Sequence, residues 1–275
     1  MKGIDIEMVS ENAVIAGGKP FTVGVKIHHH EGYHTYWQNP GIAGVPVKLE
    51  WKLPEGFSAG PIQWPHPEKS MMAIHPVHGF ERDVMLLVEI TPPAKLESTR
   101  VGLKATASWM ACADGCYPGR KELSCEVTAG DAAKPDPILA SAFEKARTEL
   151  PKPLEGWKVE ALSEIDAPEV KLRLIPAAGQ IGQVKELYFF SSDGQISSDP
   201  PQRVTKFGDG FEITAERSAY GPKGQPKLPG VLMVTTAADG GQAFGTIEPA
   251  FPGGPAKVVQ AGEAPAAAKE CDCAK

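Results

Sequence analysis

Alternation of apolar and polar residues runs through most of residues 1–130, and it constrains the fold more than any other feature of the sequence. Successive side chains of a β-strand point to opposite faces, so a period of two predicts strands with one buried face. The alternating sets are Phe21, Val23, Val25 and Ile27; Val47, Leu49, Trp51 and Leu53; Val84, Leu86, Val88 and Ile90; Val101, Leu103, Ala105, Ala107 and Trp109; and Leu123, Cys125 and Val127. Turn sequences such as NPG and TPP separate the sets, which is typical of an antiparallel β-sandwich.

One segment departs from this pattern. The sequence DPILASAFEKARTELPKP predicts a short helix, with Asp136 as N-cap and Pro137 at the first helical position. Its apolar face would hold Ile138, Leu139, Ala142, Phe143 and Ala146. Alternation then resumes, and hairpins are predicted around 208–210 and 239–241.

These signals divide the chain into two tandem β-sandwich domains joined by a short helix. The predicted ranges are 1–130, 131–153 for the connection, 154–258, and an Ala-rich tail at 259–275 that is expected to be disordered.

Composition excludes some classes of function. The chain has 275 residues and a net charge of −6, and no basic stripe is present, so nucleic acid is not an expected partner. No apolar run approaches the roughly 20 residues that a membrane-spanning helix needs. The beginning, MKGIDIEMVSEN, lacks the continuous apolar core of a signal peptide. The protein is therefore expected either to stay in the cytoplasm or to lack its leader in this sequence.

Two of the five cysteines, Cys112 and Cys116, lie four positions apart around a turn in WMACADGCYPG. A tight turn can bring such a pair within disulfide distance, but a bridge over so short a loop stabilises the fold little. A reversible exchange pair and a plain structural disulfide both fit the spacing, while zinc would require about four ligands. Arg120 and Lys121 are expected to favour a thiolate here, and Asp114 to oppose it.

The other cysteines carry weaker signals. Cys125 alternates in phase with apolar neighbours, so a buried, inert thiol is expected. Cys271 and Cys273, in the tail, could bind a soft metal, form a disulfide or have no role.

Histidines and aromatic residues cluster in the first third of the sequence. All seven histidines lie between residues 28 and 78, and Met71 and Met72 lie among them. Imidazole and thioether groups suit copper, but no ligand geometry follows from the pattern, so ordinary loop and packing roles are favoured. The aromatic run from Tyr33 to Trp37 is interpreted as core.

The stretches HTYWQNPG, GPIQWP and CxxxCYPG together resemble the N-terminal periplasmic region of the thiol:disulfide interchange protein DsbD family. The similarity is greatest to the branch named suppressor of copper sensitivity protein B, and it extends over most of the chain. It implies an all-β fold of two tandem immunoglobulin-like antiparallel β-sandwich domains, with Cys112 and Cys116 as the catalytic redox pair.

The resemblance also implies a function. A thiol:disulfide oxidoreductase module of this family receives electrons from a thioredoxin-like donor and passes them to disulfide-bearing proteins in the periplasm or another extracytoplasmic compartment. The redox-active disulfide needs no cofactor or metal, and an association with a membrane-embedded redox protein is implied. The alternative is a non-catalytic copper-binding or copper-tolerance protein that uses the His/Met loop and the tail cysteines.

In relatives, a mobile loop covers the cysteine pair. The sequence HPEKSMMAIHPVHGF falls about where such a loop is expected, so Met71, Met72 or Phe80 is expected to cover the thiols.

Overall fold

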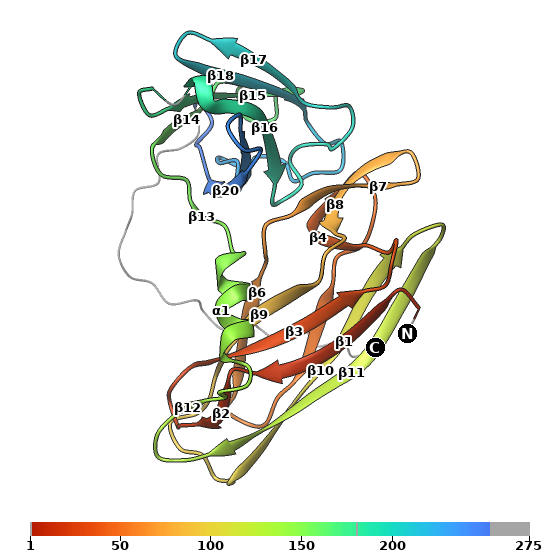
Figure 1. Cartoon of the computed structure of the whole chain (residues 1–275), viewed down its shortest axis with the longest axis vertical. Coiled ribbons are helices and arrows are strands. Elements are labelled where there is room, and N and C mark those ends of the chain that lie inside the picture. The colour runs from red at the N-terminus through yellow and green to blue at the C-terminus, as the bar shows by residue number, and fades with distance from the viewer. Residues whose placement is uncertain (1, 180, 254–275) are drawn as a thin grey trace, which may run out of the picture.

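The computed structural model describes residues 2–179 and 181–253, which form two β-sandwiches with a small sheet between them (Figure 1). We call the lower one in Figure 1 the first sandwich, the upper one the second sandwich, and the three-stranded sheet β4-β8-β7 the bridging sheet. The all-β, immunoglobulin-like fold class predicted from the sequence is confirmed.

The first sandwich contains a four-stranded and a five-stranded sheet. In sheet order, the four strands are β1 (Ile4–Ser10), β3 (Phe21–His29), β9 (Val84–Thr91) and β6 (Ser58–Gln63). The five are β12 (Lys134–Pro135), β2 (Asn12–Ile15), β11 (Cys116–Ala129), β10 (Arg100–Cys112) and β5 (Lys48–Lys52). The alternating apolar residues of β3, β9 and β10 fill the space between the sheets and are buried, as their period of two predicts.

The bridging sheet consists of β4 (Thr35–Gly41), β8 (His75–Phe80) and β7 (Glu68–Met72). The region around His75 and His78, predicted as a loop, is therefore a β-hairpin. Its two strands pair from Glu68 opposite Gly79 to Met72 opposite His75. Strand β4 pairs with β8 on the other side, with an irregularity between Tyr36 and Gly41.

The second sandwich contains two four-stranded sheets. One consists of β13 (Lys152–Pro153), β20 (Gln242–Ile247), β19 (Gly230–Thr236) and β16 (Val184–Ser191), and the other of β14 (Trp157–Ala161), β15 (Glu169–Pro176), β18 (Gly210–Glu216) and β17 (Arg203–Phe207). A single 3₁₀ turn, η1 (Ile181–Gln183), precedes β16. Both predicted hairpins are present, with Phe207 opposite Gly210 and Thr235 opposite Gln242.

The two sandwiches are packed against each other rather than linked loosely. Phe190, Val231 and Met233 of the second sandwich belong to the same buried cluster as the core of the first. The rings of Trp37 and Phe190 meet edge to face with their centroids 6.2 Å apart. The sequence did not predict this shared core. The division of the chain into domains that end at residue 130 and begin at residue 154 stays a prediction.

The connecting helix α1 (Ala140–Thr148) begins later than the sequence predicted. Asp136 accepts hydrogen bonds from the backbone nitrogens of Ile138 and Ala140, and these bonds close a turn before the helix. This turn leaves Ile138 87% exposed, so its assignment to the apolar face was wrong, whereas Phe143 and Ala146 are buried. Among the described residues, no helix combines the length and apolar character needed to span a membrane.

The burial of Phe143 predicts its contribution to stability. Phe143 is fully buried against Met85 and Leu87 on the outer face of β9. Phe143→Ala should lower the free energy of unfolding by about 3–5 kcal/mol, because it removes a buried ring and leaves a cavity. Ile138→Ala, on the same segment but exposed, should change it by less than about 0.5 kcal/mol. Urea unfolding followed by fluorescence measures both, and equal effects would contradict the packing of α1.

Candidate functional site

Cys112 and Cys116 form a disulfide at the closed end of the β10–β11 hairpin. They are the last pair in the register of the two strands, and their Cα atoms are 4.2 Å apart. The backbone nitrogen of Ala113 donates to the carbonyl of Gly115 at 3.0 Å, which closes the three-residue turn. The structure thus brings together the two residues that the sequence singled out, while their catalytic role stays a prediction.

The two sulfur atoms have different surroundings. Cys112 is 0% exposed, whereas Cys116 is exposed to solvent. Exchange requires a thiolate to approach a disulfide sulfur, so access favours attack at Cys116. In that reaction Cys112 is the sulfur that leaves.

Tyr36 contacts the buried sulfur directly. Its hydroxyl donates a hydrogen bond to Cys112 Sγ at 2.9 Å. The Tyr36 side chain is fully buried, and burial raises the pKa of this phenol above its ordinary value. The hydroxyl therefore keeps its proton at neutral pH and can donate to sulfur throughout an exchange reaction.

His34 extends this contact. Its Nε2 lies 3.4 Å from the Tyr36 hydroxyl, and the two rings meet edge to face. Burial lowers the pKa of His34, opposed by the charge of Glu81, so the imidazole is neutral at pH 7. The sequence interpretation placed these aromatic residues in the core and missed their contact with the redox pair. Their i, i+2 spacing put them on one face of a strand, but nothing local indicated a cysteine 76 positions away.

Backbone contacts fix this arrangement. His34 N donates to Cys112 O at 2.9 Å, and Cys112 N donates to His34 O at 3.0 Å, so the end of β10 is bridged to the residue before β4. Gly44 then crosses close to the Tyr36 ring at a φ of +107°. A Cβ there would lie 2.2 Å from a ring carbon, so only glycine allows this crossing.

The β7–β8 hairpin covers the buried side of the disulfide. Met72 packs against the buried cluster formed by Tyr36, Val77 and Cys112. Of the three residues expected to cover the thiols, Met72 is the one that packs against the cluster containing Cys112. Met71 is instead 54% exposed, and Phe80 is buried in the core of the first sandwich, so Met72 is the one of the three alternatives that the structure favours.

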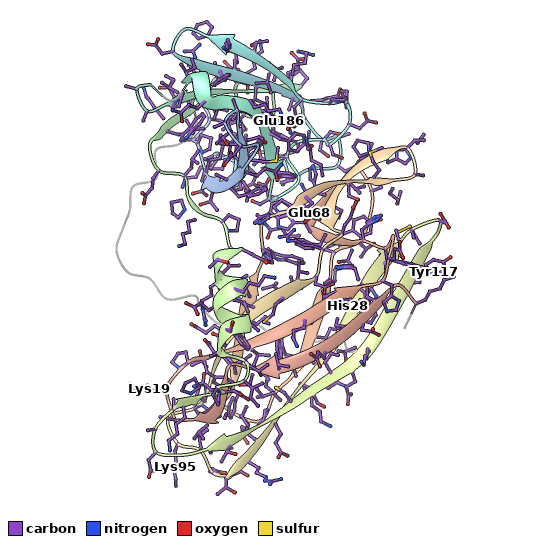
Figure 2. The ribbon with its side chains drawn as sticks, viewed as in Figure 1. Lys19, His28, Glu68, Lys95, Tyr117 and Glu186 are labelled. Atoms are coloured by element: carbon purple, nitrogen blue, oxygen red, sulfur yellow. A yellow bond between two sulfur atoms is a disulfide. The ribbon has the colours of Figure 1, made fainter. Side chains whose placement is uncertain are left out.

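The cations expected to favour a thiolate are engaged elsewhere. Arg120 pairs with Glu50 at 3.1 Å, and Lys121 Nζ donates to the carbonyl of Ile6 at 2.8 Å. Beside exposed Cys116 lies Tyr117, at the tip of the hairpin (Figure 2). Lys2 Nζ lies 3.8 Å from the centroid of the Tyr117 ring.

The histidines have several separate partners. His28 pairs with Asp83 at 2.8 Å and His30 with Asp5 at 3.1 Å, while His66 stacks on Phe244. Within residues 2–179 and 181–253, no group of three or more His, Cys, Asp or Glu side chains is arranged to hold a metal ion. Cys271 and Cys273 lie outside the described residues, so the copper hypothesis that includes them is not tested.

Cys125 is half-buried and packs against the core of the first sandwich. Burial raises the pKa of its thiol to about 11. Cys125 is thus less buried than its alternation predicted, while the raised pKa disfavours the reactive thiolate.

Comparison with known proteins gives a family match and similar folds. Residues 7–127 match the family model described as "Thiol:disulfide interchange protein DsbD, N-terminal". The N-terminal periplasmic domain of ScsB from Proteus mirabilis is similar in structure over 91% of this chain and 95% of that one, with a TM-score of 0.64 and 15% identity. The reduced DsbD N-terminal domain of Neisseria meningitidis aligns over 47% of this chain and 90% of that one, with a TM-score of 0.24 and 18% identity. No curated protein sequence is significantly similar to the chain.

The unequal burial predicts an order of alkylation. After reduction, a limiting amount of iodoacetamide at pH 8 should modify Cys116 well before Cys112, because Cys116 alone of the pair is exposed. Cys125 should also react slowly, since a pKa of about 11 makes its thiolate about a hundredfold scarcer than that of an exposed cysteine. Peptide mass mapping measures the order, and unfolding in urea should remove it. Equal labelling of Cys112 and Cys116 in the folded protein would contradict the site geometry.

Proposed function

We propose, from the match of residues 7–127 to the N-terminal family model of the thiol:disulfide interchange protein DsbD, that the chain is an extracytoplasmic thiol:disulfide oxidoreductase module. It passes reducing equivalents to partner proteins through reversible opening of the Cys112–Cys116 disulfide. The observation that carries this proposal is the disulfide with one sealed and one exposed sulfur, at the tip of a hairpin.

Reduction of the pair begins at the exposed sulfur. A thiolate of a thioredoxin-like donor attacks Cys116 Sγ, the Cys112–Cys116 bond breaks, and Cys112 leaves as a thiolate. A second donor thiol then attacks the donor sulfur of the mixed disulfide and releases Cys116. The donor ends as a disulfide, and the pair gains two electrons and two protons.

The second half-reaction passes these electrons on. The Cys116 thiolate attacks a disulfide of the acceptor, and one acceptor sulfur leaves as a thiolate. Cys112 then attacks Cys116 Sγ, which restores the intramolecular disulfide and releases the second acceptor thiol. Cys112 is suited to this resolving role because it is held within bonding distance of Cys116 and shielded from other partners.

Tyr36 and His34 support the chemistry at Cys112. The Tyr36 hydroxyl donates to Cys112 Sγ, so it stabilises the charge that develops when this sulfur leaves. His34, neutral and within 3.4 Å of that hydroxyl, completes a polar chain inside an apolar cluster. Burial disfavours a thiolate at Cys112. The polar groups of Tyr36 and His34 therefore stabilise this thiolate more in the apolar cluster than they would in water.

The partners follow from the family and stay proposals. We propose a thioredoxin-like domain or protein as donor, disulfide-bearing periplasmic proteins as acceptors, and an association with a membrane-embedded redox protein that renews the donor. We also propose that the chain is divided into two domains, at residues 1–130 and 154–258.

A trapping experiment tests this function. Cys112→Ser leaves Cys116 able to attack and removes the resolving thiol, so mixed disulfides with acceptors should accumulate. Cys116→Ser leaves only a sealed thiol and should trap nothing. Both variants are made with Cys125, Cys271 and Cys273 replaced by serine and are expressed in a bacterial periplasm. Acid quenching, non-reducing electrophoresis and mass spectrometry identify the complexes.

The pair of variants makes the outcome decisive. Complexes that form with Cys112→Ser, disappear on reduction and are absent with Cys116→Ser support exchange through Cys116. If neither variant captures a protein, or both capture the same set equally, the proposed function is wrong.

Replacing Tyr36 tests its role. Tyr36→Phe keeps the ring and removes the hydrogen bond to the leaving sulfur, so reduction of the disulfide by dithiothreitol at pH 7 should slow by about tenfold. Tyr33→Phe is the matched control, because its ring lies near Tyr117 and neither sulfur accepts from it among the described hydrogen bonds. Quenched mass spectrometry gives both rates. An unchanged rate for Tyr36→Phe would exclude the hydroxyl from the reaction.

A further inference from the structure

The β7–β8 hairpin lies between the redox pair and the second sandwich. On its inner side, Met72 and Val77 pack with Tyr36 and Cys112. Figure 2 shows Glu68, on this hairpin, at the junction below Glu186 of the second sandwich. The outer side of the hairpin therefore faces a different domain from the one that carries the disulfide.

Three side chains of the second sandwich, those of Glu186, Tyr188 and Ser198, contact the outer side of the β7–β8 hairpin. Glu186 forms an ion pair with Lys69 of β7. The hydroxyl of Tyr188 lies 2.9 Å from His78 Nε2, in β8, and the two rings meet edge to face. Burial lowers the pKa of His78 to about 4 and raises that of Tyr188 to about 12, so both groups are neutral at pH 7.

Ser198 joins the hairpin to the neighbouring strand. Its hydroxyl donates to the carbonyl of Pro76, in β8, at 2.7 Å. The same oxygen accepts from the backbone nitrogen of Ile42, directly after β4, at 2.8 Å. Ser198 is 3% exposed, so both hydrogen bonds are shielded from water and their loss leaves buried backbone groups unpaired.

The base of the hairpin is anchored to the first sandwich, because β8 pairs with β4, Phe80 is buried in the first core and Glu68 pairs with Arg82, whereas its turn has fewer contacts. Its outer strand β7 pairs only with β8 among the described strands, and Met71 and Ile74 near its turn are 54% and 80% exposed. A pocket of about 450 Å³ lies between the hairpin and β16 and is lined by Met71, Val77, Leu187 and Val204 among others. The hairpin and the second sandwich are therefore not closely packed at this place.

We propose that the second sandwich is a positioning element for the redox pair: Tyr188 and Ser198, aided by Glu186, hold the β7–β8 hairpin over Cys112 and so determine how often its sulfur is uncovered. This inference deepens the proposed function and rests on it for its biological meaning. It assigns the second sandwich a direct part in the reactivity of a cysteine in the first.

The test measures uncovering of Cys112 without any redox partner. Replacing Cys116, Cys125, Cys271 and Cys273 by serine leaves Cys112 as the single thiol of the chain. Its rate of reaction with iodoacetamide then reports how often the hairpin opens. Ser198→Ala and Tyr188→Phe should each raise this rate by about tenfold, since each removes buried hydrogen bonds that exist only when the hairpin is closed.

Matched controls separate local opening from general destabilisation. Ser197→Ala alters the neighbouring serine, whose hydroxyl bonds locally to Asp199, and Tyr220→Phe alters a tyrosine that is 96% exposed. Neither should change the rate. Phe143→Ala lowers global stability at a distance from the hairpin, and its labelling rate in native buffer should also stay unchanged.

Two results would overturn the inference. One is an unchanged rate in both Ser198→Ala and Tyr188→Phe. The other is an equal acceleration by Phe143→Ala with the steep urea dependence of global unfolding, because labelling would then proceed through the unfolded chain. The assay contains no exchange partner, so failure here leaves the trapping result intact, and failure of trapping leaves this result intact.

Discussion

Two backbone hydrogen bonds between His34 and Cys112 determine the chemical asymmetry of the site. They place the residue before β4 beside the end of β10, so Tyr36, two residues further, reaches the sulfur of Cys112. Among the described strands, β11 pairs on its other edge only with β2 near Thr128, so no strand pairs with that edge beside Cys116. The two cysteines are opposite each other in register, yet one is covered and the other is open.

The same strand connects the site to the rest of the molecule. β4 forms the bridging sheet with the β7–β8 hairpin, and Trp37 of β4 packs on Phe190 of the second sandwich. Apolar residues from both sandwiches thus belong to one buried cluster. Because packed cores deform little, this shared cluster fixes β4, with which the β7–β8 hairpin pairs, relative to the second sandwich.

The sequence predicted the strands with regular alternation, the hairpin turns near 208–210 and 239–241 and the cysteine pair, because each rests on a local pattern. Alternation fixed which face of β3 is buried, and a three-residue turn sufficed to bring Cys112 beside Cys116. The contact between Tyr36 and Cys112 could not be predicted, since it depends on tertiary pairing across 76 positions. For the same reason Phe80, one of three residues expected to cover the thiols, was not recognised as part of the core. Ile138 was assigned to a buried helix face because the local turn that Asp136 closes before the helix was not predicted.

The environment of the buried sulfur bears on the direction of electron flow. A cysteine pair becomes a strong oxidant when charges or dipoles stabilise the thiolate of its reduced form. Here Arg120 and Lys121 are engaged with other groups, and Cys112 Sγ has a neutral hydroxyl as its polar contact, with a neutral imidazole behind it. A hydrogen bond eases the departure of the sulfur without the large stabilisation that a cation would give. This environment agrees with the proposed function, in which the reduced pair passes electrons to partner proteins.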